Sequence, residues 1–269
     1  MAAIVNHYFH IALQKLLSPL RPDTSDTTFR HLKYMDHQFL VLLNQAVGWR
    51  MWLPGERFEE EEIRILRERI DPDFICIDVG ANLGVYSVLL SSMVPQGGVY
   101  AFEPHALAHH MLNINLILNS VENVEVFNIL VSDEEKEVGF SEATDSAFSS
   151  MIDTGRRKVA RTTERKAIDL DKFAAERSLV LDFVKIDVEG AELQVLQGMK
   201  KQLSDTSLRP KYLLVEADRK NLEVYGQRPE DVVAFLKKYG YRARTISWKG
   251  LEDEFNPDIE MQNVLFSAQ

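Results

Sequence analysis

The residues best suited to chemistry lie in a loop that follows a short apolar run. The stretch DVGANLG (78–84) combines an acid, two glycines and an amide side chain. Gly80 lets the chain turn sharply off a strand, and Gly84 lets the following helix pack closely. A strand, a glycine turn and a helix form a unit that binds nucleosides at the carboxyl end of the strand. Asp78, Gly80, Asn82 and Gly84 are therefore candidate ligand-binding residues.

The same loop argues against a dinucleotide. Its spacing departs from Gly-x-Gly-x-x-Gly, and Asn82 stands where a middle glycine would let the backbone approach a pyrophosphate. Asp78 would also repel a phosphate and suits a ligand that carries an ammonium group or hydroxyls. An NAD-dependent oxidoreductase shares the strand and the glycine turn, so it is an alternative, but a weaker one.

Two further apolar runs end in acids. Glu103 follows the second run and precedes Pro104, which stops the strand and leaves the carboxylate at its tip. An acid about 20 residues beyond the glycine turn can accept hydrogen bonds from both ribose hydroxyls. The third run ends at Ser132 and Asp133, where an acid can receive an adenine amino group. The equal alternative is that Asp133 is an ordinary turn acid.

The elements that must position these residues alternate. Short apolar runs rich in β-branched and aromatic residues occur at 74–80, 98–104, 124–131, 181–187 and 211–217. Helical patterns separate them, which predicts βαβ units and a parallel sheet covered on both faces. After a helix at 229–239, two strands at 241–248 and 260–268 have only a loop between them. Strands joined in this way pair antiparallel.

The first part of the chain has a different character. Residues 1–70 show no strand alternation, so we expect an N-terminal helical extension before a catalytic domain at 71–269. A first helix carries apolar residues from Ile4 to Leu16, a second runs over 28–46, and a third starts at 59–62 and ends near Ile70. We expect the helices of residues 1–50 to cover the active-site edge of the sheet or the interface of a homo-oligomer.

Composition narrows the class of protein. The chain has 269 residues, 45% hydrophobic and 27% charged, as in ordinary globular proteins. Its net charge of −10 repels phosphate backbones, so we expect no nucleic-acid partner. The single cysteine, Cys76, fits a reducing compartment, and no stretch reaches the ~20 apolar residues of a membrane span. We therefore expect a cytoplasmic enzyme without an integral membrane segment.

Several stretches together resemble the FkbM family of S-adenosylmethionine-dependent class I methyltransferases. The matching stretches are FICIDVGANLGVYS (74–87), VYAFEPHALAHHMLNINLILN (99–119), LDFVKIDVEGAELQVLQGM (181–199) and NVLF (263–266). The resemblance implies an α/β, Rossmann-like, seven-stranded, mostly parallel sheet with an antiparallel last strand. It also implies S-adenosylmethionine as cofactor, bound by the loop at 78–84, by Glu103, and by Ser132 and Asp133. The resemblance covers about residues 50 to 266, so it implies no role for residues 1 to about 50.

The resemblance places the motif KIDVEGAE (185–192) at the active site. An alcohol is a poor nucleophile while it is protonated, so its methylation needs a base or a cation nearby. Asp187 or Glu189 would be the base or would orient the acceptor, and Lys185 alternates onto the same face. We expect O-methylation of a hydroxyl on a small molecule such as a sugar. N-methylation on the same scaffold, or an inactive methyltransferase-like binding module, are alternatives.

The alternative role of acids in this region is to bind a divalent cation. Asp187, Glu189 and Glu216, which follows the fifth apolar run, can supply the oxygen ligands that magnesium prefers. A bound cation would lower the pKa of an acceptor hydroxyl directly. The charge of Lys185 would compete at that site, so no metal is the favoured expectation.

The long segment 134–168 is the expected region for acceptor selection. Long insertions above the carboxyl edge of a sheet often form lids. Its basic residues Arg156, Arg157, Lys158 and Arg161 suit an acidic acceptor. The alternative is a β-hairpin whose charges are solvated.

Overall fold

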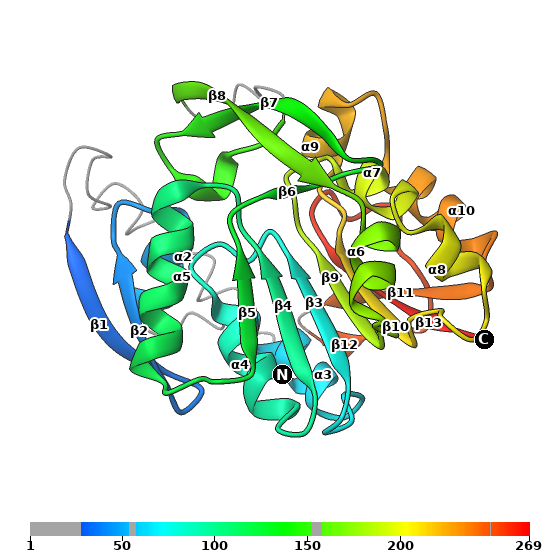
Figure 1. The fold of residues 1–269 in the computed structure, drawn as a ribbon, viewed down its shortest axis with the longest axis horizontal. Coiled ribbons are helices and arrows are strands. Elements are labelled where there is room, and N and C mark those ends of the chain that lie inside the picture. Colours follow the sequence, from blue (N-terminus) through cyan, green and yellow to red (C-terminus); the bar gives the residue numbers. More distant parts are fainter. Residues whose placement is uncertain (1–27, 54–57, 152–157, 248) are drawn as a thin grey trace.

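A computed structural model of the chain describes residues 28–53, 58–151, 158–247 and 249–269. An eight-stranded sheet crosses the molecule, with helices on both of its faces (Figure 1). Along the sheet the strands are β12 (Gly250–Leu251), β11 (Tyr241–Ser247), β13 (Asn263–Ala268), β10 (Tyr212–Glu216), β9 (Phe183–Ile186), β3 (Ile75–Val79), β4 (Gly98–Phe102) and β5 (Val124–Phe127).

The pairing of these strands confirms the predicted α/β fold. β5, β4, β3, β9 and β10 run parallel to one another, whereas β13 lies antiparallel between β10 and β11. β11 and β13 are the two strands that no helix separates, and this is why they pair antiparallel. The two-residue β12 extends the expected seven strands to eight.

Helices pack on each face because successive strand side chains point to opposite sides. In β3, Cys76 belongs to one hydrophobic cluster, while Ile77 and Val79 belong to the other. The first cluster includes residues of α3 (Glu60–Arg67), α4 (Val85–Met93) and α5 (Ala106–Leu118). The second includes residues of α6 (Leu170–Arg177), α7 (Glu192–Gln197), α8 (Lys200–Ser204), α9 (Arg219–Val224) and α10 (Pro229–Lys237).

The prediction of a helix over 28–46 is wrong. The structure has a β-hairpin there, β1 (Phe29–Tyr34) with β2 (His37–Leu42), followed by the short helix α2 (Ala46–Trp52). Met35 and Asp36 form the two-residue turn, and both have positive φ, 45° and 69°, as a hairpin turn of this length favours. The helix expected from 59 to 70 is confirmed as α3, and the expected first helix lies outside the described residues.

Two asparagines of α5 hold the hairpin. Asn115 accepts the backbone N–H of Leu40 at 2.7 Å and donates to the Leu40 carbonyl at 3.2 Å. Asn119 bonds the same two groups of Gln38, at 2.8 and 2.7 Å. Four residues of helix rise about 6 Å and two residues of strand about 6.6 Å, so the two spacings match. The asparagine amides thus satisfy the outer edge of β2 as a neighbouring strand would.

A second, three-stranded sheet lies over the carboxyl ends of β3, β4 and β5 (Figure 1). It consists of β6 (Leu130–Val131), β8 (Val159–Ile168) and β7 (Lys136–Ala143), so the segment 134–168 does contain an antiparallel pair. The prediction that one strand runs over 124–131 is wrong. β5 ends at Phe127, and Leu130–Val131 pair with β8 instead.

Among the helices of the described residues, none has both the length and the apolar character that crossing a membrane requires.

Candidate active site

A pocket opens at the carboxyl ends of β3, β4, β9 and β10. The chain that lines it comes from the glycine turn, from the residues after β4 and β9, from α2 and the start of α3, and from the segment 146–151 beneath the second sheet. Parallel strands bring their carboxyl ends to one edge of the sheet, which explains why the acids that follow β4 and β9 and the acid that ends β10 all line this pocket.

The glycine turn is fixed by its surroundings. Gly80 has φ of +78°, and a Cβ atom there would lie 1.8 Å from the carbonyl oxygen of Asp187. The N–H groups of Gly80 and Ala81 both donate to the Phe102 carbonyl at 3.0 Å. Gly84, with φ of +87°, precedes α4, and a Cβ there would lie 3.0 Å from Leu112 of α5. Gly84 therefore permits close helix–helix packing, while Gly80 permits contact between the ends of β3 and β9.

Glu103 is buried at the tip of β4 and lines the pocket. Its Oε2 accepts the backbone N–H of Asn82 and its Oε1 that of His105, both at 2.7 Å. Burial raises the pKa of Glu103 to about 7, although the two backbone hydrogen bonds oppose the rise. A carboxylate has about four lone-pair sites, so the side chain can still accept hydrogen bonds from a ligand.

Ser132 and Asp133 are not brought into the pocket. The Ser132 N–H donates to the Ile168 carbonyl at 2.8 Å, and the Asp133 carboxylate pairs with Lys136 at 2.5 Å. The cause is the early end of β5, because the chain has already left the main sheet for β8 when it reaches these residues. The pocket beyond Glu103 is lined instead by the apolar residues Ile129, Leu130, Val131, Phe140 and Met151.

Lys185 sits between two acids. Its Nζ lies 3.2 Å from Asp187 and 3.7 Å from Asp78, and 4.8 Å from the centre of the Tyr86 ring. Burial lowers the pKa of Lys185, but the two carboxylates raise it more, so the ammonium stays charged. Asp78 itself is fully buried, accepts the Ser87 hydroxyl at 2.6 Å, and is not among the residues that line the pocket. Asp78 therefore stabilises the Lys185 ammonium from the buried side, away from the pocket.

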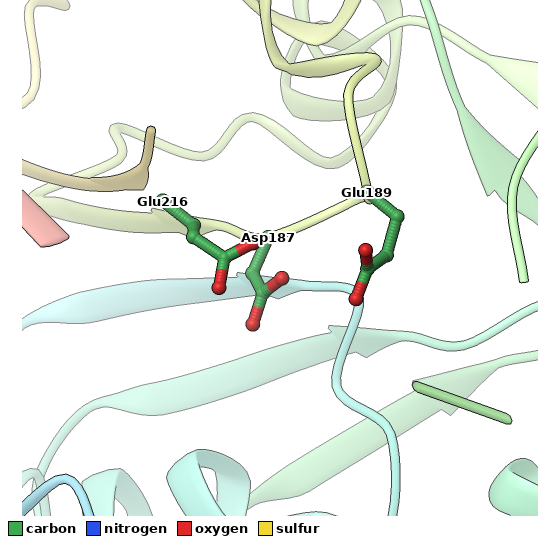
Figure 2. A group of neighbouring side chains, drawn as sticks. All are labelled: Asp187, Glu189 and Glu216. Carbon is green, nitrogen blue, oxygen red and sulfur yellow. The ribbon is translucent and has the colours of Figure 1, made fainter. Parts of the chain in front are cut away.

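Asp187, Glu189 and Glu216 form an acidic cluster at the ends of β9 and β10 (Figure 2). Each offers one carboxylate oxygen, and these oxygens lie within 4.8 Å of one another. Burial, and then the charges of Asp187 and Glu189, raise the pKa of Glu216 well above its usual range. Glu189 also accepts the Asn221 amide at 2.6 Å. Such a cluster can hold a proton or a cation.

One wall of the pocket was missed by the sequence reasoning, because it comes from residues before the first recognised motif. Arg50, Phe58 and Glu59 line this wall. The Arg50 guanidinium lies 4.7 Å from the centre of the Phe58 ring. The Glu59 carboxylate accepts hydrogen bonds from Tyr86 at 2.8 Å and from Asn263 at 3.1 Å. Only the tertiary structure brings these positions beside the glycine turn.

Two residues of the predicted basic cluster, Lys158 and Arg161, are described by the structure, and neither lines the pocket. Arg161 is bound to Glu142 at 2.8 Å, as is Arg165, while Lys158 is not among the pocket-lining residues. Arg156 and Arg157 lie outside the described residues. Near the same segment, the carboxylate of Asp145 accepts the Ala46 N–H at 3.1 Å and so joins the 146–151 wall to α2.

A family model described as "Methyltransferase FkbM domain" matches residues 78–243. The sequence is 29% identical over 209 residues to the AMB antimetabolite synthetase AmbE of Pseudomonas aeruginosa, covering 64% of this chain and 10% of that protein. It is 28% identical to Methyltransferase sdnD of Sordaria araneosa, covering 47% and 60%. It is 26% identical to the Hexuronic acid methyltransferase AglP of Haloferax volcanii, covering 68% and 69%. The chain thus spans less than two thirds of the length of AmbE and of sdnD.

Proposed function

Because the chain belongs to the FkbM methyltransferase family, we propose that it transfers the methyl group of S-adenosylmethionine to a hydroxyl of a small molecule such as a sugar. The observation that carries the proposal is Glu103, whose carboxylate two backbone N–H groups hold at the tip of β4, facing the pocket. An ionised acid held in this way is a ready acceptor for a pair of ribose hydroxyls.

The donor would lie across the tips of β4 and β3. Its ribose would meet Glu103, and its adenine would enter the apolar part of the pocket formed by Ile129, Leu130 and Phe140. The methionine end would follow the glycine turn at Gly80 and Ala81. Glu103, Gly80 and Asn82, which line the pocket, keep the donor-binding roles expected from the sequence. Gly84 does not line the pocket and would act through helix packing, and Asp78 would act through Lys185.

The acceptor would lie over β9 and β10, beside the acidic cluster. Its hydroxyl oxygen attacks the methyl carbon, the carbon–sulfur bond breaks, and S-adenosylhomocysteine leaves as a neutral thioether. The hydroxyl proton passes to the cluster, where Asp187 or Glu189 orients the acceptor as base. Lys185 holds the Asp187 carboxylate in place, since its ammonium lies 3.2 Å away. Placing donor and acceptor in contact can supply about 7–11 kcal/mol of the barrier reduction.

A divalent cation at Asp187, Glu189 and Glu216 is the alternative version of this step, and the convergence of their oxygens supports it. These ligands suit magnesium, which would take over the activation of the hydroxyl. The ammonium of Lys185 already lies 3.2 Å from Asp187 and supplies a positive charge there, so we favour the version without metal.

The first test is calorimetric titration with S-adenosylhomocysteine and, separately, with NAD. The proposal expects binding of the first ligand and none of the second. The second test supplies donor with a labelled methyl group together with neutral sugars, amino sugars and uronic acids. Label in an alkali-stable ether of a sugar supports O-methylation. Label on nitrogen would favour the N-methyltransferase alternative, and NAD binding without S-adenosylhomocysteine binding would overturn the proposal.

A further inference from the structure

Building on the proposed function, we infer that Glu59 is a donor-binding residue that accepts the ammonium group of the methionine end of S-adenosylmethionine. Glu59 lies outside the segment 78–243 that the family model matches. It reaches the pocket from the start of α3, on the wall that also carries Arg50 and Phe58.

The Glu59 carboxylate is held on one side only. The Tyr86 hydroxyl and the Asn263 amide both donate to its Oε2, at 2.8 and 3.1 Å. Among the described residues, Oε1 takes part in no hydrogen bond, and the side chain lines the pocket. Two fixed donors on one oxygen orient the carboxylate and leave the other oxygen for a ligand.

The backbone of Glu59 supports a binding role. Its φ of +54° and ψ of +20° place a non-glycine residue in the left-handed region, directly before the first residue of α3. Such a conformation costs about 1–3 kcal/mol and is found preferentially at binding sites. Here it directs a side chain into the pocket at the end of a helix whose next three residues, Glu60 to Glu62, are also acidic.

The order of strands indicates which acid can reach the ammonium group of the donor, Glu59 or a member of the acidic cluster. Neighbouring strands lie about 4.8 Å apart, so β9 and β10 are roughly 10 and 14 Å from the ribose position at β4. The methionine chain of the donor reaches over β3, one strand from Glu103. Tyr86, which holds Glu59, belongs to the first turn of α4 just after the β3 turn. Glu59 is therefore at the right distance for the donor, and the cluster is left for the acceptor.

The partners of these acids also favour Glu59 as the residue that binds the ammonium group. Asp187, the member of the cluster nearest in sequence to β9, is paired with Lys185 at 3.2 Å. Glu189 accepts the Asn221 amide at 2.6 Å. Glu59 has two neutral donors, the Tyr86 hydroxyl and the Asn263 amide. A hydrogen bond from an ammonium to a carboxylate is charge-assisted, and such bonds are stronger than those from the two neutral donors.

The test distinguishes binding of the amino-acid end of the donor from binding of its nucleoside. Wild type and Glu59→Gln are titrated by calorimetry with S-adenosylhomocysteine and with 5′-methylthioadenosine, which has the same nucleoside but no amino-acid end. We expect Glu59→Gln to weaken S-adenosylhomocysteine binding about 10- to 150-fold, the range for a hydrogen bond to a charged group. Its affinity for 5′-methylthioadenosine should equal that of the wild type.

Glu62→Gln is the matched control. Glu62 also accepts the Asn263 amide, at 3.0 Å, but it is not among the pocket-lining residues. We expect this variant to bind both ligands as the wild type does. Equal loss for both ligands in Glu59→Gln, or no loss for either, overturns the assignment of Glu59. Failure of the wild type to bind S-adenosylhomocysteine would overturn the proposed function, and the role of Glu59 with it.

Discussion

The Glu103 carboxylate accepts the backbone N–H of Asn82 at 2.7 Å, so the acid at the tip of β4 and the glycine turn after β3 are joined by a direct hydrogen bond. Asn82 has φ of +50°, a left-handed conformation that asparagine tolerates better than most residues. The left-handed conformation therefore explains why an asparagine is compatible with the loop at this point. In this conformation the turn presents a backbone N–H group to Glu103.

Donor affinity should depend on the ionisation of Glu103. Its pKa of about 7 is above that of an exposed glutamate, so it contributes stability at low pH that is lost as the pH rises through about 7. The ionised form is the better acceptor for ribose hydroxyls, so binding of S-adenosylhomocysteine should strengthen between pH 6 and 8, as calorimetry at each pH would measure. Glu103→Gln should bind about 10- to 150-fold more weakly at pH 8. It should also lose this part of the pH dependence, and a profile as steep as that of the wild type would contradict the role of Glu103.

Gly80→Ala should destabilise the fold strongly. The added Cβ would meet the Asp187 carbonyl at 1.8 Å, and the positive φ adds strain. We expect a loss of at least about 3 kcal/mol in the free energy of unfolding, measured by urea denaturation. Gly226→Ala is the control, since Gly226 has φ of +69° with nothing within 4 Å of the new Cβ, and should lose about 1–2 kcal/mol. Equal losses would show that only the backbone conformation matters at Gly80.

Asp187→Asn and Glu189→Gln should lower kcat about 10²- to 10⁴-fold, the usual effect of removing a general base. Donor affinity should change little, because the proposed function places these side chains beside the acceptor. The measurement is a methyl-transfer assay with an acceptor found in the screen, together with donor titration of each variant. Full activity in both variants would mean that neither acid is the general base, and that the enzyme acts by positioning donor and acceptor alone.

The same assay with a chelator separates the two versions of the acceptor step. Without metal, wild-type activity should be unchanged by the chelator and by added magnesium. Activity that disappears with the chelator and returns with magnesium would establish the cation at Asp187, Glu189 and Glu216, with ligand distances of about 2.0–2.1 Å.

Lys185→Met should destabilise the protein more than its loss of packing explains. The substitution leaves the fully buried Asp78 without the ammonium 3.7 Å away, and removal of one partner of a buried ion pair costs about 3–5 kcal/mol. Adding Asp78→Asn should restore part of this loss in urea denaturation at pH 7. Additive losses in the double variant would mean that the two residues do not stabilise one another.

Asn115→Ala should loosen the β1–β2 hairpin. Asn115 is buried and bonds both backbone groups of Leu40 and the carbonyl of Leu83, and these groups would be left unsatisfied. We expect a loss of about 1–3 kcal/mol in the free energy of unfolding and faster hydrogen exchange at Leu40. Asn113→Ala is the control, because among the described residues the Asn113 side chain bonds only to His109, within α5. Similar losses in the two variants would argue that helix propensity, not the hairpin contact, is responsible.

The sequence by itself determined the order of the longer strands in the main sheet, from β3 to β13, and most of the helices between them. Short apolar runs rich in β-branched and aromatic residues, the glycine turn and the missing helix between β11 and β13 are local signals, and each can be recognised in a few residues. Glu103 could be placed at a strand tip for the same reason, because Pro104 follows it directly. The acids after β9 and β10 also fall at strand ends that the topology of a parallel sheet must bring to one edge.

The tertiary structure alone decided which of these residues meet. Asp78 lies beneath Lys185 because the pleat of β3 points its side chain away from the pocket, and Ser132 and Asp133 leave the site because β6 pairs with β8. The hairpin at 29–42 escaped prediction because its apolar residues fit a helix as well, and its turn, Met35 and Asp36, has no glycine to mark it. Glu59 reaches the glycine turn through Tyr86 and Asn263, which lie 27 and 204 residues away along the chain. Contacts across such separations depend on packing, and no local pattern encodes them.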